Sequence, residues 1–214
     1  MGKFILFDFD GVIADSFAIA SALAHRVCKQ NTPERYRSAF EGNIYNTYPS
    51  DGSRPDHKEQ EECEHGLNWW DEYEKSFATV TPFDGVCDVI RDLSKGYSLV
   101  IISSGSRRFI DPFLEHNGIA DRFVGVLDVD AHTHKTKKIE MIFEKHGITS
   151  ADCVFVTDTL GDIREAAHHS IGSIAVTWGF HSRETLERGV PFRIINSPRE
   201  IPDAVAEYFS RSIM

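Results

Sequence analysis

The chain has 214 residues, of which 41% are hydrophobic and 26% are charged. This length and balance predict a globular protein with one substantial core and room for a small accessory domain. The net charge is −10 and no run rich in Lys or Arg stands out, which disfavours a nucleic acid polymer or an anionic membrane as partner. No apolar stretch approaches the length of a membrane-spanning helix, so we expect no membrane association.

The four cysteines are scattered along the chain, as Cys28, Cys63, Cys87 and Cys153. No two of them form a CxxC pair. Scattered thiols are typical of a reducing compartment rather than of a disulfide scaffold or a zinc site. We therefore expect free thiols and a cytoplasmic location.

The segment "FILFDFDGVIADS" (residues 4–16) is an apolar run that ends in two carboxylates. The run predicts a buried strand, and Asp8 and Asp10 follow it two positions apart. Burying one carboxylate is costly, and burying two together costs more because like charges repel. Residues two apart on a strand share a face, so a positive group is expected beside this pair.

Residues 17–81 predict a helical insertion. One helix is expected over residues 16–29 and another around residues 67–77, with a polar stretch rich in Pro, Ser, Gly and charge at 46–62. No part of this block has the pattern of a strand. Residues 82–85 have the composition of a linker that returns the chain to the first unit.

From residue 85 onward, apolar runs alternate with amphipathic stretches. The apolar runs predict strands at 98–102, 123–129, 153–157, 174–177 and 192–195. The amphipathic stretches predict helices at 85–93, 107–116, 137–146, 162–169, 183–188 and 199–209. This alternation predicts an α/β fold in which a parallel sheet carries helices on both faces.

Polar residues follow the first four predicted strands, at the edge of the sheet where ligands gather in open parallel folds. They supply carboxylates, hydroxyls, backbone N–H groups and ammonium groups. In chain order they are Asp8 and Asp10, then Ser103, Ser104 and Gly105, then Lys135, Lys137 and Lys138, and finally Asp158 and Asp162.

This inventory predicts chemistry on a phosphoryl group. Several carboxylates at one place need a hard cation, and ligation by oxygen alone suits Mg²⁺. A serine, backbone N–H groups and a lysine can bind the oxygens of an anion. A carboxylate beside the metal can attack phosphorus, and a second carboxylate can protonate the leaving oxygen and later activate water.

Four segments in this order resemble the motifs of the haloacid dehalogenase superfamily, in its phosphoglycolate phosphatase-like branch with a helical cap. They are "DFDGVIADS" (8–16), "LVIISSGS" (99–106), "HKTKKIEMIFEKHG" (134–147) and "VFVTDTLGDIREA" (154–166). The sequence departs from the family's pattern at Thr136, where many members have Pro, and at Thr157, where Gly is usual. The spacing favours Lys135 as the lysine of the third segment and leaves Lys138 as the competitor.

The resemblance implies a role for each matching residue. Asp8 would be the nucleophile and a metal ligand, and Asp10 the general acid and base, with its backbone carbonyl on the metal. Ser103 and Lys135 would bind the phosphoryl group, while Asp158 and Asp162 would complete the Mg²⁺ site, the latter directly or through water. The further residues expected to bind the substrate are Gly11, Ser104 and Gly105.

The resemblance also implies an architecture and a reaction. Residues 1–16 and 82–214 would form a Rossmann-like α/β/α core, and residues 17–81 a helical cap inserted after the first strand. The enzyme would be a Mg²⁺-dependent phosphatase that hydrolyses a small phosphorylated metabolite through an aspartyl-phosphate. We expect it to act as a monomer or a weak dimer.

Other reactions on the same core stay open at the level of sequence. A phosphomutase would use the same groups with a different cap. A phosphonate hydrolase would need a cap lysine for Schiff-base chemistry, for which Lys29 and Lys58 are available. A protein that binds a phosphorylated ligand without turnover is the third alternative.

Overall fold

The structure is a computed structural model that describes residues 2–48 and 69–211. Its centre is a six-stranded sheet of order β3-β2-β1-β4-β5-β6, in which every neighbouring pair is parallel. The strands are β1 (Phe4–Phe7), β2 (Ser98–Ile102), β3 (Phe123–Leu127), β4 (Cys153–Thr157), β5 (Gly172–Val176) and β6 (Arg193–Ile195). The predicted α/β fold with a parallel sheet is confirmed.

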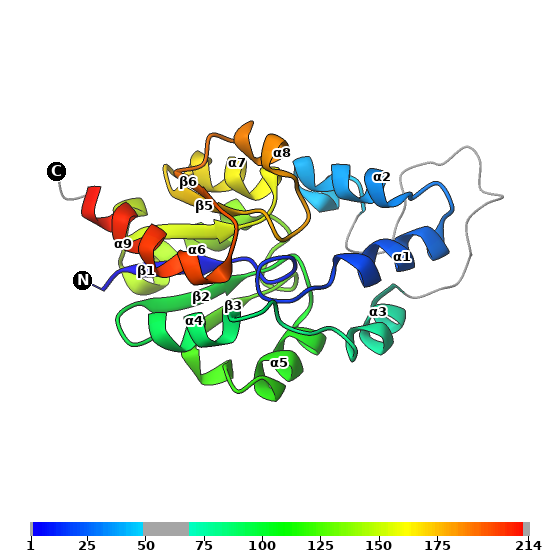
Figure 1. Ribbon diagram of the computed structural model, residues 1–214, viewed down its shortest axis with the longest axis horizontal. Helices are drawn as coiled ribbons and strands as arrows, with labels where there is room; N and C mark the ends of the chain where they lie inside the picture. Colours follow the sequence, from blue (N-terminus) through cyan, green and yellow to red (C-terminus); the bar gives the residue numbers. More distant parts are fainter. Residues whose placement is uncertain (1, 49–68, 212–214) are drawn as a thin grey trace.

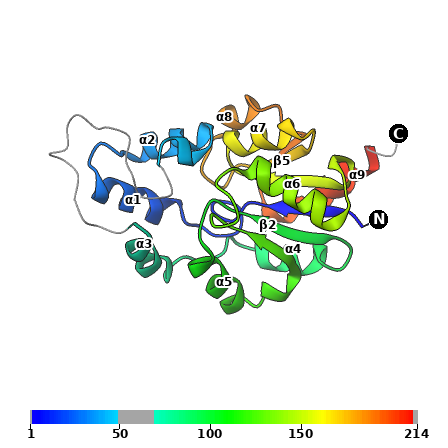
Figure 2. The same ribbon diagram turned by 180° about the vertical axis from the view of Figure 1, so that it is seen from behind.

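Helices cover both faces of this sheet, because β1 buries alternate side chains on opposite sides. Ile5 and Phe7 pack with α4 (Val86–Leu93), α5 (Arg107–His116) and α9 (Ile201–Arg211). Phe4 and Leu6 pack on the opposite face, with α6 (Lys135–His146) and α7 (Leu160–His168). Figure 1 shows α4 and α9 in front of the sheet, and Figure 2, seen from behind, shows α6 in front. The short helix α8 (Arg183–Glu187) adds Leu186 to a small apolar cluster with Ile163 and Ala175.

Element boundaries differ from the predicted ones near the site. Helix α6 begins at Lys135 rather than at residue 137, and α7 begins at Leu160 rather than at 162. Thr159 explains the second difference, because its side chain accepts a hydrogen bond from the backbone of Asp162 and so caps the helix earlier. Strand β3 ends at Leu127 rather than at residue 129. The chain turns at Asp128, whose side chain accepts a hydrogen bond from the N–H of Ala131.

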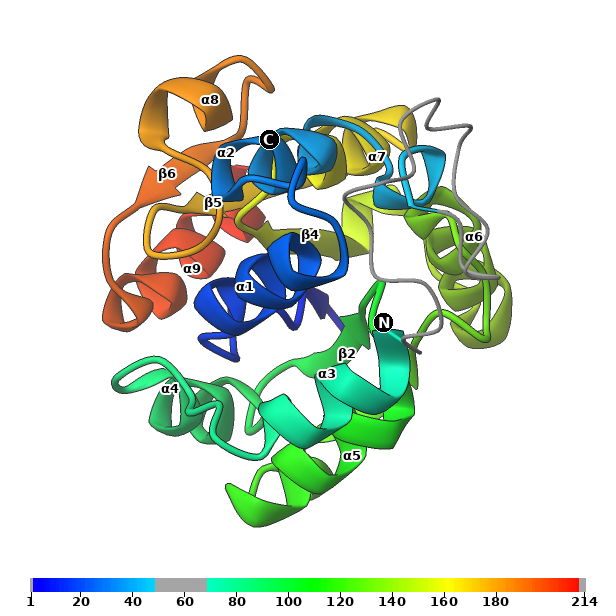
Figure 3. The same cartoon turned by 90° about the vertical axis from the view of Figure 1, so that its right-hand side faces the viewer.

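The described residues 17–48 and 69–77 form a mainly helical unit, which we call the cap. Its helices are α1 (Phe17–Val27), α2 (Pro33–Ser38) and α3 (Trp69–Phe77), with the 3₁₀ turns η1 (Ala39–Glu41) and η2 (Ile44–Asn46). Helix α2 was not predicted. Figure 1 places the cap at the end of the molecule opposite both termini, and Figure 3 shows it facing the viewer at that end. The two crossings between core and cap lie side by side, since Ala14 forms a β-bridge with Pro82.

The expectation of scattered free thiols is wrong for one cysteine. Cys28, at the end of α1, is disulfide-bonded, whereas Cys87 and Cys153 are free. Cys63 and Lys58 lie outside the described residues, as does most of the predicted polar stretch. Across the described ranges, no helix has both the length and the apolar content that a membrane crossing requires.

Candidate active site

The order of the strands brings the predicted site residues together at one edge of the sheet. Strands β2 and β4 flank β1 on either side, and the backbone N–H of Asp8 donates to the carbonyl of Val156 at 2.9 Å. The segments after β1, β2 and β4 therefore begin at adjacent positions. They carry Asp8, Ser103 and Asp158, and all three are buried.

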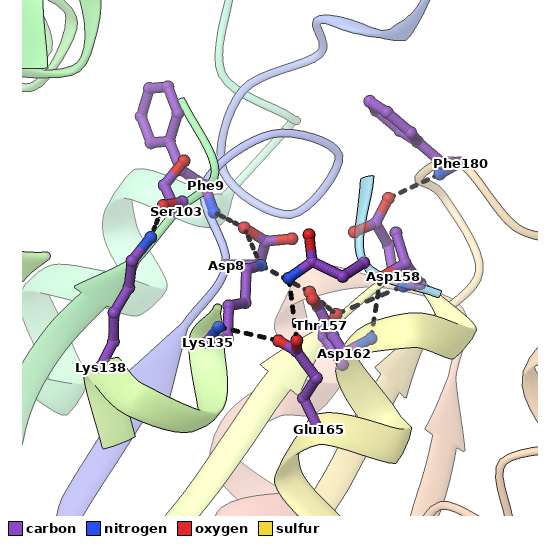
Figure 4. A network of polar contacts seen from close by, with 12 residues as sticks. Asp8, Phe9, Ser103, Lys135, Lys138, Thr157, Asp158, Asp162, Glu165 and Phe180 are labelled. Atoms are coloured by element: carbon purple, nitrogen blue, oxygen red, sulfur yellow. Dashed lines mark hydrogen bonds and ion pairs between the residues drawn. The ribbon is translucent and has the colours of Figure 1, made fainter. Parts of the chain in front are cut away.

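Lys135 lies between two carboxylates. Its Nζ is 2.8 Å from Oδ1 of Asp8 and 2.7 Å from Oδ2 of Asp162 (Figure 4). Lys135 is only 3% exposed and Asp8 only 6%, so these ion pairs are shielded from water. The hydroxyl of Thr157 donates to the same oxygen of Asp162, at 2.7 Å. The lysine at the first position of α6 is thus the one that reaches the carboxylate after β1.

The charges in this cluster do not balance. Burial raises the pKa of Asp8, and the charge of Lys135 only partly opposes that rise. Burial would also raise the pKa of Asp162, but Lys135 and its hydrogen bonds hold it below the usual value. The two carboxylates in turn raise the pKa of Lys135 despite its burial. One ammonium faces three buried carboxylates once Asp158 is included, which leaves an excess of negative charge.

Asp158 has one satisfied oxygen and one orphaned oxygen. Its Oδ2 accepts a hydrogen bond from the N–H of Phe180 at 2.7 Å, while Oδ1 is buried and has no partner among the described residues. Burial raises the pKa of this carboxyl to about 7. A Cβ at Gly11 would lie 2.0 Å from Asp158 Oδ2, and one at Gly179 would lie 2.3 Å from it. Two glycines therefore let the backbone pass close to this side chain.

The donor groups fit a hard divalent cation. Among residues 2–48 and 69–211, no group of three or more His, Cys, Asp or Glu side chains is placed to hold a metal ion. The site that the resemblance implies takes side-chain ligands from Asp8 and Asp158 and, directly or through water, from Asp162, while Asp10 would contribute its backbone carbonyl. The orphaned Oδ1 of Asp158 and the uncompensated negative charge are what such a site presents to Mg²⁺. Asp162, engaged by Lys135 and Thr157, is the least available of the predicted ligands.

Ser103 itself forms its side-chain and carbonyl hydrogen bonds with groups of the core. Its Oγ accepts from the N–H of Gly105 at 2.8 Å, and its carbonyl accepts from Lys138 Nζ at 2.5 Å. The side chains of Lys135 and Lys138, one turn apart, thus have different partners. The N–H of Gly105 already donates within the loop, and Ser104 is only partly buried.

Lys138 has no carboxylate within ion-pair distance among the described residues and is fully buried. Burial, with the charge of Lys135 as the second cause, lowers its pKa to about 7. Lys137, by contrast, is exposed and pairs with Glu140 at 2.8 Å. The three lysines of the third segment are therefore in three different environments.

Asp10 lies where the core meets the cap. Its Oδ1 accepts hydrogen bonds from the hydroxyls of Ser16, at 2.7 Å, and Tyr73, at 3.0 Å. Burial raises the pKa of this carboxyl, and the two hydroxyls oppose that rise. Gly11 follows with φ of +77°, which favours glycine, and its N–H donates to the carbonyl of Ala14. This tight turn leads the chain from the carboxylates toward the cap.

Further cap residues reach the loops of the core. The hydroxyl of Tyr45 donates to the carbonyl of Ser104. Asn43 Nδ2 donates to Glu165 Oε1 and to the carbonyl of Thr133, both at 3.0 Å. Glu165 also accepts the backbone N–H of Lys135, at 2.9 Å, through its other oxygen.

Four residues near the site were not predicted from the sequence: Asn43, Tyr45, Tyr73 and Glu165. Glu165 carries a usable signal, because it lies three residues after Asp162 and therefore on the same face of α7. The three cap residues have no such signal. Their position depends on how the cap sits on the core.

The fold and this cluster of buried carboxylates and lysine define a hydrolase of the haloacid dehalogenase type. The family model described as haloacid dehalogenase-like hydrolase matches residues 5–176. The chain belongs to this family. The predicted resemblance and the prediction of an enzyme of this type, related to phosphatases, are confirmed.

Named relatives and solved structures agree with this assignment. A phosphoglycolate phosphatase of Synechococcus elongatus is 26% identical over 214 residues, which cover 95% of this chain and 97% of that protein. A Clostridium acetobutylicum structure described as a predicted phosphatase has a TM-score of 0.72 at 23% identity, covering 97% and 99% of the two chains. CbbY from Rhodobacter sphaeroides, solved with phosphate, has a TM-score of 0.73 at 17% identity, covering 94% and 96%. At these identities the two structures support the fold alone.

Proposed function

We propose that this chain is a Mg²⁺-dependent phosphatase that hydrolyses a small phosphomonoester through an aspartyl-phosphate. The observation that carries the proposal is the buried cluster in which Lys135 Nζ lies 2.8 Å from Asp8 and 2.7 Å from Asp162. Phosphoryl transfer depends on positioning and on neutralisation of negative charge. A buried nucleophile beside a fixed ammonium supplies both.

The proposed reaction has two steps, each using both carboxylates after β1. In the first, an oxygen of Asp8 bonds to phosphorus, the ester P–O bond breaks, and Asp10 gives a proton to the leaving oxygen. In the second, Asp10 takes a proton from water, whose oxygen attacks phosphorus and frees Asp8. Ser103 and Lys135 hold the phosphoryl oxygens throughout. Mg²⁺, held by Asp8, Asp158 and the carbonyl of Asp10, supplies further positive charge.

The substrate class follows the relatives. The curated relatives that match most of the chain, such as those of Synechococcus elongatus and Pseudomonas putida, are phosphoglycolate phosphatases. We therefore propose a small phosphorylated metabolite, with phosphoglycolate as the first compound to test. The domain limits at residues 16 and 82, and a monomer or weak dimer, remain predictions. A cytoplasmic location also remains one.

The test is phosphate release from a panel of small phosphoesters, with Mg²⁺ and with EDTA, for the wild type and Asp8→Asn. We expect release that needs Mg²⁺ and falls by at least about 10³-fold in Asp8→Asn, because the nucleophile works as part of a unit. Asp203→Asn is the matched control, since Asp203 is an exposed carboxylate on α9. Release that persists in Asp8→Asn or in EDTA would contradict the proposal.

The alternative reactions gain no support from the described cap. A phosphonate hydrolase needs a lysine at the site, and Lys29 is exposed at the end of α1. Binding of a phosphoester without any release would favour a protein that binds without turnover.

A further inference from the structure

The carboxylate of Asp10 is held by two hydroxyls that come from outside the sheet. Ser16 lies at the crossing into the cap, and Tyr73 lies on α3 of the cap itself. Both donate to the same oxygen, Oδ1. No hydrogen bond to Oδ2 comes from any residue in the described part of the chain. One oxygen is therefore fixed, and the other is available to a substrate.

Ser16 is diverted from the role that its position in the sequence predicts. It stands at the N-cap of α1, where a serine side chain usually accepts a backbone N–H and stabilises the helix by about 1 kcal/mol. Here its side chain makes no capping hydrogen bond, and its hydroxyl donates to Asp10 at 2.7 Å. The residue is fully buried. The side chain of Ser16 therefore contacts the carboxylate of Asp10 rather than capping the helix.

Tyr73 is fixed by aromatic contacts that span the cap and the core. Its ring stacks on Trp69 of the cap, with centroids 5.7 Å apart, and meets the ring of Phe109 in α5 edge-on at 4.9 Å. Burial raises the pKa of its hydroxyl, which therefore stays protonated and able to donate. The hydroxyl that reaches Asp10 therefore belongs to a ring packed between Trp69 of α3 and Phe109 of α5.

We propose that Tyr73 is a positioning residue that turns Oδ2 of Asp10 toward the leaving oxygen, so that proton transfer requires the cap to be seated. This inference rests on the proposed phosphatase activity. In the step concerned, the proton on Oδ2 moves to the ester oxygen while that oxygen keeps the electron pair of the breaking P–O bond. The carboxylate that remains is stabilised by the two hydroxyls on Oδ1.

The test compares two kinds of ester in the wild type and in Tyr73→Phe, which removes a single oxygen. An alkyl phosphate needs its leaving oxygen protonated, whereas 4-nitrophenyl phosphate releases a weakly basic phenolate. General acid catalysis is worth about 10²–10⁴-fold. We therefore expect kcat/KM for the best alkyl ester of the panel to fall roughly tenfold or more. The value of kcat/KM for the aryl ester should change by less than about twofold. Ser16→Ala should likewise lower kcat/KM for the alkyl ester and not for the aryl ester.

Tyr48→Phe is the matched control, because the hydroxyl of Tyr48 is also in the cap but donates to Asn31 at 2.9 Å. Tyr48→Phe should leave kcat/KM for both esters unchanged. Equal losses on both esters, or no loss on the alkyl ester, would overturn the inference while leaving the phosphatase activity standing. Wild-type turnover of the aryl ester alone would also overturn it, since no acid catalysis would exist for Tyr73 to support. Release from neither ester would defeat the proposed function itself.

Discussion

The core side and the cap side of the candidate site are held together by different forces. On the core side, Asp8, Lys135 and Asp162 form buried ion pairs at the ends of strands and helices. On the cap side, the uncharged side chains of Asn43 and Tyr73 donate hydrogen bonds to carboxylates of the core, and the exposed ion pair of Arg188 with Glu41 adds to them. Reacting groups need a rigid scaffold; a hydrogen bond to a charged group contributes about 1.5–3 kcal/mol, whereas breaking a buried ion pair costs about 3–5 kcal/mol. The division of labour is thus visible in the chemistry of the contacts.

The largest expected effect comes from Lys135→Met, which breaks the core side. Methionine keeps the volume but leaves Asp8 and Asp162 buried without their cation. Breaking a buried pair in this way costs about 3–5 kcal/mol of stability, and loss of an electrostatic donor lowers kcat about 10²–10³-fold. Urea unfolding in EDTA and phosphate release in Mg²⁺ measure the two losses separately.

Lys137→Met is the control for this substitution. Lys137 lies two residues away on the same helix, exposed and paired with Glu140, and an exposed pair contributes little. Both measurements should stay at wild-type values. If Lys135→Met unfolded at the wild-type urea concentration, the ion pairs of the core side would not be the stabilising feature assigned to them.

The core side could be predicted from sequence because its residues sit at fixed places in a regular fold. Asp8, Ser103 and Asp158 each follow a strand, and parallel strands end at one edge. Strand ends do not choose between Lys135 and Lys138, and the spacing of the third segment favours Lys135 without excluding Lys138. The choice depends on where α6 begins and which face of its first turn meets Asp8, and the helix begins two residues earlier than its amphipathic pattern indicates.

A smaller effect is expected at the seam between the two sides, from Gly161→Ala. Within a helix this change is stabilising by up to about 1 kcal/mol. A Cβ at Gly161 would, however, lie 2.3 Å from the carbonyl oxygen of Gly42 in the cap. Such overlap costs about 1–3 kcal/mol, at least as much as the helix gains, so kcat/KM should fall about 10- to 100-fold and the thermal unfolding temperature should hold or fall.

Gly96→Ala is the matched control, because a Cβ there meets nothing within 4 Å. It should leave kcat/KM unchanged. If Gly161→Ala kept full activity, close contact between η1 and α7 would not be needed for turnover.

The cap side escapes sequence analysis for a physical reason. Residues 33–48 contain one short helix and two 3₁₀ turns, and elements of this length have no clear periodicity. Asn43 contacts Thr133, which lies 90 residues further along the chain, and Tyr45 contacts Ser104, which lies 59 residues further along. Only the packing of the cap on the core sets these pairs, and no spacing rule encodes it.

The smallest expected effect concerns Lys138 and marks where the charged cluster of the core side ends. Its amine donates to the carbonyl of Ser103, and burial lowers its pKa to about 7. That value includes the charged groups that act on Lys138: Lys135, which lowers the pKa, and Asp128, Asp8 and Asp162, which raise it. Burial and Lys135 outweigh these carboxylates, so Lys138 is neutral above about pH 7 in the folded protein.

The unfolded chain then holds one more proton than the folded chain between about pH 7 and pH 10, so stability must rise with pH in that window. The free energy of unfolding of the wild type should rise relative to that of Lys138→Met by at most about 1.4 kcal/mol per pH unit in this window. Below pH 7 the amine is charged in both states, so the difference between the two proteins should not change with pH. Urea unfolding of both proteins in EDTA at pH 6, 7, 8 and 9 measures the difference. Lys137→Met should run parallel to wild type throughout. A difference between wild type and Lys138→Met that stays constant over this range would mean that Asp128 and the other carboxylates keep Lys138 charged, and the charged cluster would then extend to the loop that holds Ser103.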